Sequence, residues 1–146
     1  MEKTLNYLGI ARKAGLLEPG EENSGAAVRT GKAKLLLLAA DASDNARRRA
    51  EGYVHRRKIP LVRLPYTKEQ VSDAIGKPGC SMVAVTDIGL ASSIMKTLAE
   101  ALPEKYGETA EEIRLKNERT ARQRREAAVN DKSKKLGNKK AERKTD

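Results

Sequence analysis

The most constraining feature of this sequence is the segment Lys34–Ala40 (KLLLLAA), in which six consecutive apolar residues follow a lysine. A short continuous apolar run is typical of a β-strand that is covered on both faces, because side chains on both sides of the strand must then be buried. Leu61–Leu64 and Met82–Thr86 are further short apolar segments. Leu16–Leu17 suggests a very short strand before a turn at Pro19–Gly20.

Segments with helical periodicity separate these strands. The predicted helices are one that contains Leu5, Leu8 and Ala11 and ends near Gly15, one over Glu21–Thr30, one over Asp44–Lys58 capped by Ser43 or Asp44, one that begins at Thr67, and one that Asp87 caps. Short strands that alternate with helices are typical of an α/β fold. We therefore predict a three-layer α/β/α sandwich with a four-stranded mixed sheet.

The last third of the chain has a different composition. From Pro103 onward the large aliphatic residues are Ile113, Leu115, Val129 and Leu136. Four such residues bury too little apolar area to offset chain entropy, so we place a domain boundary at residue 103. Residues 1–103 are expected to form the domain and residues 104–146 a basic extension. Residues 108–129 favour a solvated helix or a disordered segment, and residues 130–146 favour disorder.

Charge indicates the class of partner. The chain has 30 Lys and Arg against 20 Asp and Glu, a formal net charge of +10. Such an excess predicts a polyanionic partner, with nucleic acid favoured over an anionic membrane surface. The chain has four Tyr but no Phe or Trp, which disfavours a sheet that reads single strands by base stacking.

Two scarce residue types exclude other classes. One cysteine excludes an internal disulfide framework, and one histidine excludes a His/Cys zinc site within a single chain. The first residues lack the long apolar stretch of a secretion signal, and Leu35–Ala40 is too short to span a bilayer. We expect a soluble, cytoplasmic, monomeric protein that needs no cofactor or metal and does not contact membranes.

Two pairs of residues allow an enzymatic as well as a structural interpretation. Asp41 and Asp87 each follow an apolar strand, where converging carboxylates bind metals or share a proton. Asp is also a common helix cap, and we favour capping. Cys80 with His55 is a conceivable nucleophile pair, but a lone cysteine beside a strand is usually a small buried hydrophobe. An enzyme is therefore disfavoured.

Two polar loops favour nucleic-acid contact. Gly20–Asn23 opens a predicted helix, whose free backbone N–H groups can meet phosphate or base acceptors. Gly76–Ser81 connects a helix to the Met82 strand, and its glycines permit close approach of a nucleic-acid backbone.

These residues also resemble a known family. Gly20–Ser43 (GEENSGAAVRTGKAKLLLLAADAS), with Ala11–Gly15, Ile59–Val62, Ala74–Lys77 and Val83–Asp87, is similar to the signature of the ribosomal L7Ae/L30e superfamily of RNA-binding proteins. The likeness covers about residues 3–100 and is greatest to the bacterial YlxQ-type ribosomal-like members.

The resemblance implies an α/β/α sandwich that binds structured RNA, in many members a kink-turn. In those members a Gly-x-Asn-Glu-x-x-Lys segment reads tandem sheared G·A pairs, and a second loop covers flipped nucleotides. This chain has Glu22-Asn23 in place of Asn-Glu and Ala26 in place of the lysine, and Ser43 stands where some members carry a glutamate.

The sequence thus predicts a non-enzymatic protein that binds structured, kink-turn-like RNA, with ribosomal RNA, the ribosome or translation factors as expected partners. The expected RNA-binding residues are Gly20, Glu21, Glu22, Asn23 and Ser24 in the first segment, Lys77, Pro78, Gly79, Cys80 and Ser81 in the second, and Arg12, Lys13, Lys32 and Lys68 on phosphate, together with the basic extension. A protein-interaction or ribosome-assembly module that contacts RNA only through the extension is the alternative. A small hydrolase built on Asp41 and Asp87 is a more distant one.

Overall fold

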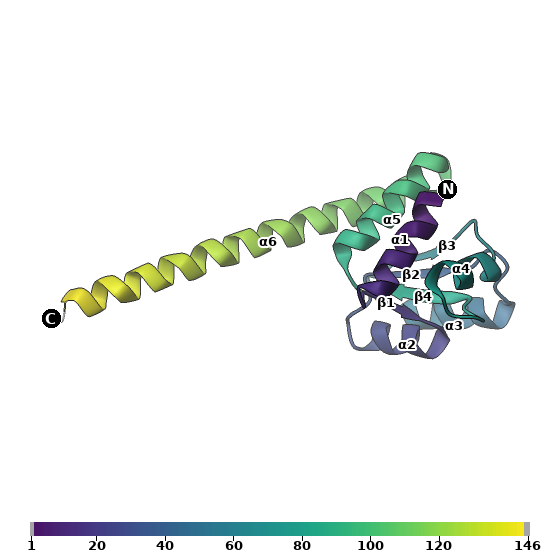
Figure 1. The fold of residues 1–146 in the computed structure, drawn as a ribbon, viewed down its shortest axis with the longest axis horizontal. Helices are drawn as coiled ribbons and strands as arrows, with labels where there is room; N and C mark the ends of the chain where they lie inside the picture. The colour runs from purple at the N-terminus through teal and green to yellow at the C-terminus, as the bar shows by residue number, and fades with distance from the viewer. Residues whose placement is uncertain (1, 145–146) are drawn as a thin grey trace.

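The computed structural model describes residues 2–144, with side chains over residues 3–131. Its elements are α1 (Glu2–Lys13), β1 (Leu17–Pro19), α2 (Glu21–Arg29), β2 (Leu35–Leu38), α3 (Asp44–Val54), β3 (Leu61–Arg63), α4 (Lys68–Ile75), β4 (Met82–Val85), α5 (Ile88–Ala101) and α6 (Pro103–Lys144). The long α6 extends well away from the remaining elements (Figure 1).

The four strands form one mixed sheet in the order β1-β4-β2-β3. β4 is antiparallel to both β1 and β2, whereas β3 is parallel to β2. The predicted four-stranded mixed sheet is therefore confirmed. The first strand runs through Pro19 rather than ending before a turn there. Proline is tolerated because β1 lies at the edge of the sheet, where a missing N–H breaks no central hydrogen bond.

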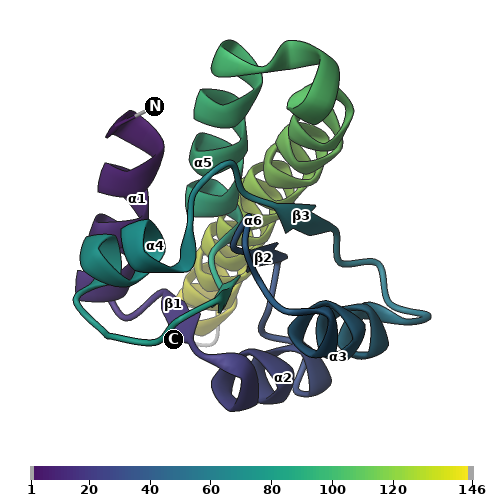
Figure 2. The same ribbon diagram turned by 90° about the vertical axis from the view of Figure 1, so that its right-hand side faces the viewer.

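The apolar run of β2 supplies both sides of the core. Leu35 and Leu37 pack with α1, α4 and α5 on one face, and Leu36 and Leu38 pack with α2 and α3 on the other. All four side chains are at most 2% exposed. This alternation confirms the prediction of a strand covered on both faces and produces the three layers visible in Figure 2.

Local capping signals mark several helix starts as predicted. The Asp87 carboxylate accepts a hydrogen bond from the Leu90 N–H at the start of α5, at 2.9 Å. The Ser43 hydroxyl accepts from the Ala46 N–H at the start of α3. The predicted helix 44–58 is shorter than expected, because the chain leaves α3 after Val54 and Arg56 adopts a positive φ of 60°.

The start of α6 packs on the rest of the protein, which differs from the expectation of a solvated or disordered extension. Tyr106 is 2% exposed and Ile113 is fully buried, and both belong to the core beside α5. The Tyr106 hydroxyl donates a hydrogen bond to the Arg63 carbonyl of β3, at 2.7 Å. Two buried side chains seven residues apart are enough to attach a helix, because they lie on the same face.

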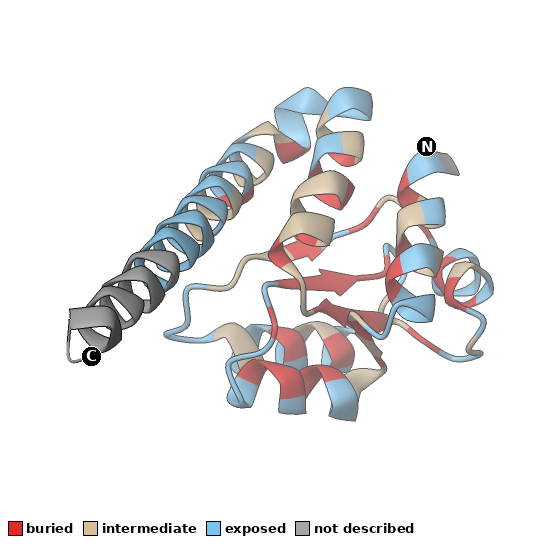
Figure 3. Ribbon diagram, turned by 60° about the vertical axis from the view of Figure 1, so that its left-hand side comes forward, coloured by how far each residue is buried: buried red, intermediate tan, exposed pale blue. Residues whose placement is uncertain are grey.

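Beyond these contacts α6 becomes exposed. Figure 3 shows buried positions on α6 only near its start, and residues 121–131 are all exposed. The backbone remains helical to Lys144, where the sequence favoured disorder from residue 130; residues 145–146 lie outside the described residues. Within residues 2–144, no helix combines the length and apolar character needed to cross a membrane.

Candidate nucleic-acid interface

The starts of three helices lie together at one end of the strands of the sheet. β2 and β3 end at this edge and β4 starts from it, because β4 is antiparallel to β2. We call it the loop edge and define it by residues 19–24, 40–44, 66–68 and 76–81. Three backbone hydrogen bonds join its segments: Gly20 N–H to the Met82 carbonyl at 2.8 Å, Ala39 N–H to the Ser81 carbonyl at 2.8 Å, and Ala40 N–H to the Tyr66 carbonyl at 2.7 Å.

The three helices that start at this edge differ in how their N-termini are capped. Ser43 caps α3, and Thr67 forms a capping box with Gln70 at the start of α4. The N-cap of α2 is Gly20, which makes no side-chain cap. Its φ of 92° is a conformation that favours glycine, and the space where a Cβ would stand is open. The first N–H groups of α2 are therefore available to an external acceptor.

The first predicted segment divides into exposed and supporting residues. The Asn23 amide donates to the Pro19 carbonyl at 2.9 Å, which leaves its carbonyl oxygen and a second N–H available. Glu22 is exposed, whereas Glu21 pairs with Arg49 of α3 at 2.6 Å. Ser24 is fully buried, with its hydroxyl directed to the Glu18 carbonyl. Ser24 therefore supports the segment instead of contacting a ligand.

The buried hydroxyl of Ser72 in α4 forms a hydrogen bond with the second predicted segment, residues 77–81. Ser72 Oγ accepts from the Cys80 N–H at 3.0 Å and donates to the Lys68 carbonyl at 2.6 Å. Pro78 and Gly79 are exposed, and Ser81 is half-buried. Cys80 is 1% exposed, so it packs in the core below the loop and is not a surface contact.

Three of the predicted phosphate-binding cations act electrostatically on Cys80 of this loop. Burial raises the pKa of the Cys80 thiol, while the positive charges of Lys77, Arg12 and Lys68 act in the opposite direction. Lys77 belongs to this loop, Arg12 lies in the last turn of α1, and Lys68 is the first residue of α4. Lys13 lies in a shallow groove between α1 and α4.

Lys32 is separated from the other predicted cations. It follows α2 and precedes Lys34, whose N–H donates to the Val85 carbonyl at the end of β4. We call this the opposite edge and define it by residues 31–34, 55–60 and 86–88. The structure therefore divides the predicted residues between two edges and does not bring Lys32 to the loop edge.

The two candidate carboxylates are separated in the same way. Asp41 follows β2 at the loop edge, and Asp87 follows β4 at the opposite edge, since the two strands are antiparallel. The convergence that the hydrolase alternative needs is therefore absent. Asp41 accepts from the Lys68 N–H at 2.7 Å, so it supports the start of α4 and not the helix that follows it in sequence.

The Cys80–His55 pair is also not formed. His55 ends α3 at the opposite edge, whereas the buried Cys80 lies at the loop edge. Among the described residues, no group of three His, Cys, Asp or Glu side chains is arranged to hold a metal ion. Sequence reasoning missed the role of Asp41 toward α4, because its partner is 27 positions away and no local signal identifies it.

Residues 2–95 match the model of the ribosomal protein L7Ae/L30e/S12e/Gadd45 family. The chain belongs to this family. The match includes the whole sheet and most of α5 but ends before α6. The helix α6 therefore lies outside the part of the chain that matches the family.

Bacterial relatives of the chain are known. It is 32% identical over 90 residues to the RNA-binding protein YlxQ of Enterococcus faecium, and the aligned region covers 62% of this chain and 85% of that protein. It is also 32% identical over 91 residues to the RNA-binding protein YlxQ of Bacillus subtilis, with 62% and 90% covered. These matches confirm the resemblance to YlxQ-type members of the L7Ae family.

Solved structures support the same fold. A protein of unknown function from Bacillus halodurans is similar with a TM-score of 0.58 and 30% identity, over 64% of this chain and 98% of that one. The Giardia lamblia 15.5kD RNA binding protein has a TM-score of 0.55 at 17% identity, over 68% of this chain and 84% of that one. The second likeness shows the fold alone.

Proposed function

We propose that the loop edge of this L7Ae-family protein binds structured RNA of the kink-turn kind. The observation that carries the proposal is the start of α2, where the N–H groups after Gly20 have no side-chain cap. Membership of the family and the names of the YlxQ relatives support RNA as the ligand.

The proposed contacts follow from what each group can donate or accept. The free oxygen and the second N–H of the Asn23 amide suit a base edge, which presents both donors and acceptors. The open space beside Gly20 allows a nucleotide to approach the backbone closely. Lys68, Lys77 and Arg12 supply positive charge for phosphate.

The departures from the family pattern shift these contacts. In the family segment the amide precedes the acidic residue, whereas here Glu22 precedes Asn23. The side chain that reads a base edge is therefore one position further into α2. Ala26 is exposed and provides no cation, so the cations around Cys80 take over phosphate binding.

The test compares a kink-turn RNA with a plain RNA duplex of equal length. Wild type is expected to prefer the kink-turn, and Asn23→Ala to reduce that preference by about 1–3 kcal/mol, the discrimination of a two-point base contact. Lys77→Gln should weaken the binding of both RNAs and reduce the slope of log affinity against log salt concentration by about 0.7–0.9. Lys96→Gln, an exposed lysine on α5, is the matched control and should leave both quantities unchanged.

Because Asn23 also bonds to Pro19, thermal unfolding of Asn23→Ala must show a folded protein. A folded wild-type chain with no preference for the kink-turn would contradict the proposal and favour the interaction-module alternative.

We further propose that the RNA is ribosomal and that the protein acts in the cytoplasm beside the ribosome. Crosslinking in cells followed by RNA sequencing should recover one dominant ribosomal-RNA site. That site should disappear with Asn23→Ala and persist with Lys96→Gln.

A further inference from the structure

A cationic cleft lies between α6 and the opposite edge of the sheet. Its volume is about 640 Å³. Lys34, Arg57 and Lys58 line it from the domain, and Lys116, Arg119 and Arg124 line it from α6. The residues are up to 90 positions apart in sequence, so only the docking of α6 brings them together. Lys116 to Arg124 lies beyond the family match, which ends at residue 95.

Backbone acceptors hold two of these cations in place. Arg57 donates from Nη1 to the Val28 carbonyl at 3.0 Å. Lys116 Nζ donates to the Lys58 carbonyl at 2.9 Å, which ties α6 to the loop after α3. These bonds orient the side chains without neutralising their charge, because carbonyl groups carry no net charge.

Few carboxylates oppose these charges. Glu112 Oε1 lies 3.6 Å from Lys116 Nζ. Asp87 also lines the cleft, and its carboxylate caps α5. Over the residues whose side chains are described, no ion pair joins Lys34, Arg57, Lys58, Arg119 or Arg124 to a carboxylate. The cleft therefore retains a large positive charge, which a concave surface concentrates.

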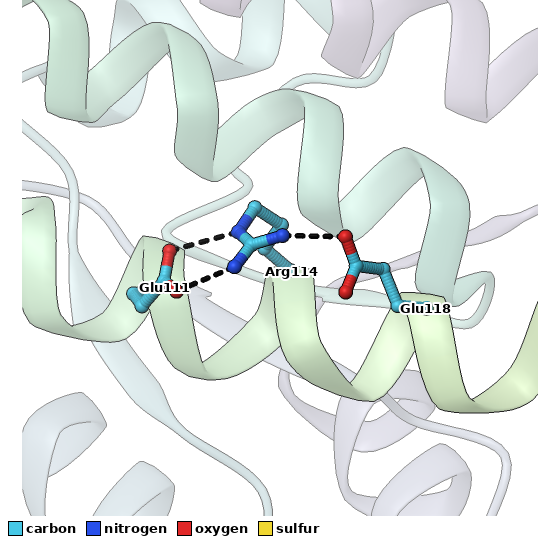
Figure 4. Close-up of polar contacts among 3 residues, drawn as sticks. All are labelled: Glu111, Arg114 and Glu118. Carbon is cyan, nitrogen blue, oxygen red and sulfur yellow. Dashed lines mark hydrogen bonds and ion pairs between the residues drawn. The ribbon is translucent and has the colours of Figure 1, made fainter.

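A neighbouring face of α6 shows the contrast. Arg114 lies in the groove between α5 and α6, where it pairs with Glu111 and Glu118 on the same helix (Figure 4). The hydrogen bond from Arg114 lowers the pKa of the Glu111 carboxyl. Arg114 is thus neutralised by carboxylates one turn away on the same helix, whereas Arg119 and Arg124, which line the cleft, have no such partner among the residues whose side chains are described.

We propose that this cleft is a second RNA site that holds a segment of sugar-phosphate backbone. It extends the function proposed for the loop edge to the other end of the sheet. Its lining includes no aromatic side chain to stack a base, whereas Thr86, Thr120 and Gln123 offer hydrogen bonds to phosphate and ribose oxygens. The cleft therefore binds RNA of any sequence, and it positions a helical arm of an RNA whose structured part occupies the loop edge.

The experiment uses the full chain and a plain RNA duplex, for which the loop edge has no structural preference. Arg119→Gln with Arg124→Gln removes two cleft charges. Arg122→Gln with Arg125→Gln removes two charges from the same turns of α6, on exposed side chains outside the cleft. Both double variants have the same net charge and nearly the same helix propensity, so they differ in the face that they alter.

The cleft pair is expected to weaken duplex binding about tenfold and to reduce the salt slope by about 1.4–1.8, the loss of two phosphate contacts. The control pair should change affinity less than threefold. Equal losses from both pairs would overturn the proposal, because general attraction to a basic helix would then explain the binding.

A second double variant tests the domain wall of the cleft. Lys34→Gln with Lys58→Gln keeps the Lys58 carbonyl that Lys116 contacts, so α6 stays attached. A loss of duplex affinity similar to that of the α6 pair supports a site with two walls. An unchanged duplex affinity would overturn it.

The loop edge is monitored separately in the same titrations. Asn23→Ala should reduce the preference for a kink-turn without changing duplex affinity. A wild-type chain that lacks this preference, but loses duplex binding through the cleft variants, would contradict the proposed function and leave the cleft supported.

Discussion

The loop edge and the opposite edge of the same sheet differ in how their charges are arranged. At the loop edge, two carboxylates have structural partners: Glu21 pairs with Arg49, and Asp41 accepts from the backbone N–H of Lys68. At the opposite edge, cations from α6 and from the domain face a common cleft with few carboxylates. The first arrangement favours recognition of shape, and the second favours attraction to any phosphate backbone.

This difference follows the limit of the family match. The loop edge is built from elements within residues 2–95, whereas three of the six cations that line the cleft come from α6. In our proposal, attaching a long basic helix to an L7Ae-family domain adds a second binding surface without altering the first. If the two edges are independent, a change that disturbs one should leave the other unaffected.

The largest effect is expected from Ile113, which attaches α6. Ile113→Ala removes a fully buried side chain and should lower the free energy of unfolding by about 2–5 kcal/mol. Duplex binding through the cleft should fall with it, while the kink-turn preference persists. Leu115→Ala is the control, because Leu115 is 44% exposed on the same helix. Equal stability of the two variants in urea unfolding would instead support a domain that ends at residue 103.

A close approach of α1 and α4 supports the loop edge alone. A Cβ at Gly9 would lie 2.9 Å from the Ala74 carbonyl oxygen, so Gly9→Ala must push α4 away. We expect a loss of about 1–3 kcal/mol and a weaker kink-turn preference, with cleft binding retained. Gly52→Ala in α3, where the Cβ meets open space, should instead stabilise by up to about 1 kcal/mol. Thermal unfolding distinguishes the two, and a harmless Gly9→Ala would contradict the close packing.

The two capping aspartates offer a matched comparison of the edges. Asp41→Ala and Asp87→Ala should each cost about 1 kcal/mol, because each loses an acceptor for a helix N–H. The Asn variants keep an acceptor and should be nearly as stable as wild type. Asp87→Asn removes a negative charge from the cleft and should raise duplex affinity by up to about fivefold. An equal gain from Asp41→Asn would show that net charge, and not the cleft, controls binding.

The smallest effect concerns the neutralised face of α6. Because Arg114 lowers the pKa of Glu111 in the folded chain, their ion pair stabilises the protein above the unfolded pKa of Glu111. That stabilisation is lost as the pH falls through the lowered folded pKa. NMR titration of the Glu111 carboxyl should show a midpoint below its ordinary value, and Arg114→Gln should restore that value. RNA affinity should not change with Arg114→Gln, since Arg114 lies outside the cleft.

Much of the fold and part of the site were determined by local sequence. The leucines of β2 require cover on both faces, because consecutive side chains of a strand point in opposite directions. Asp87 and Ser43 mark helix starts through hydrogen bonds that span three residues. The uncapped start of α2 was likewise evident from Gly20 before two glutamates.

The tertiary structure alone decided which of these pieces meet. The antiparallel pairing of β2 and β4 sends Asp41 and Asp87 to opposite edges, and pairing direction depends on contacts between segments far apart in the chain. The low average hydropathy of residues 104–146 gave no sign that α6 packs on the domain. The packing depends on Tyr106 and Ile113 lying on the same face of the helix, and an average over the segment does not register that. The cationic cleft follows from that attachment, since charges distant in sequence combine only where the fold places them together.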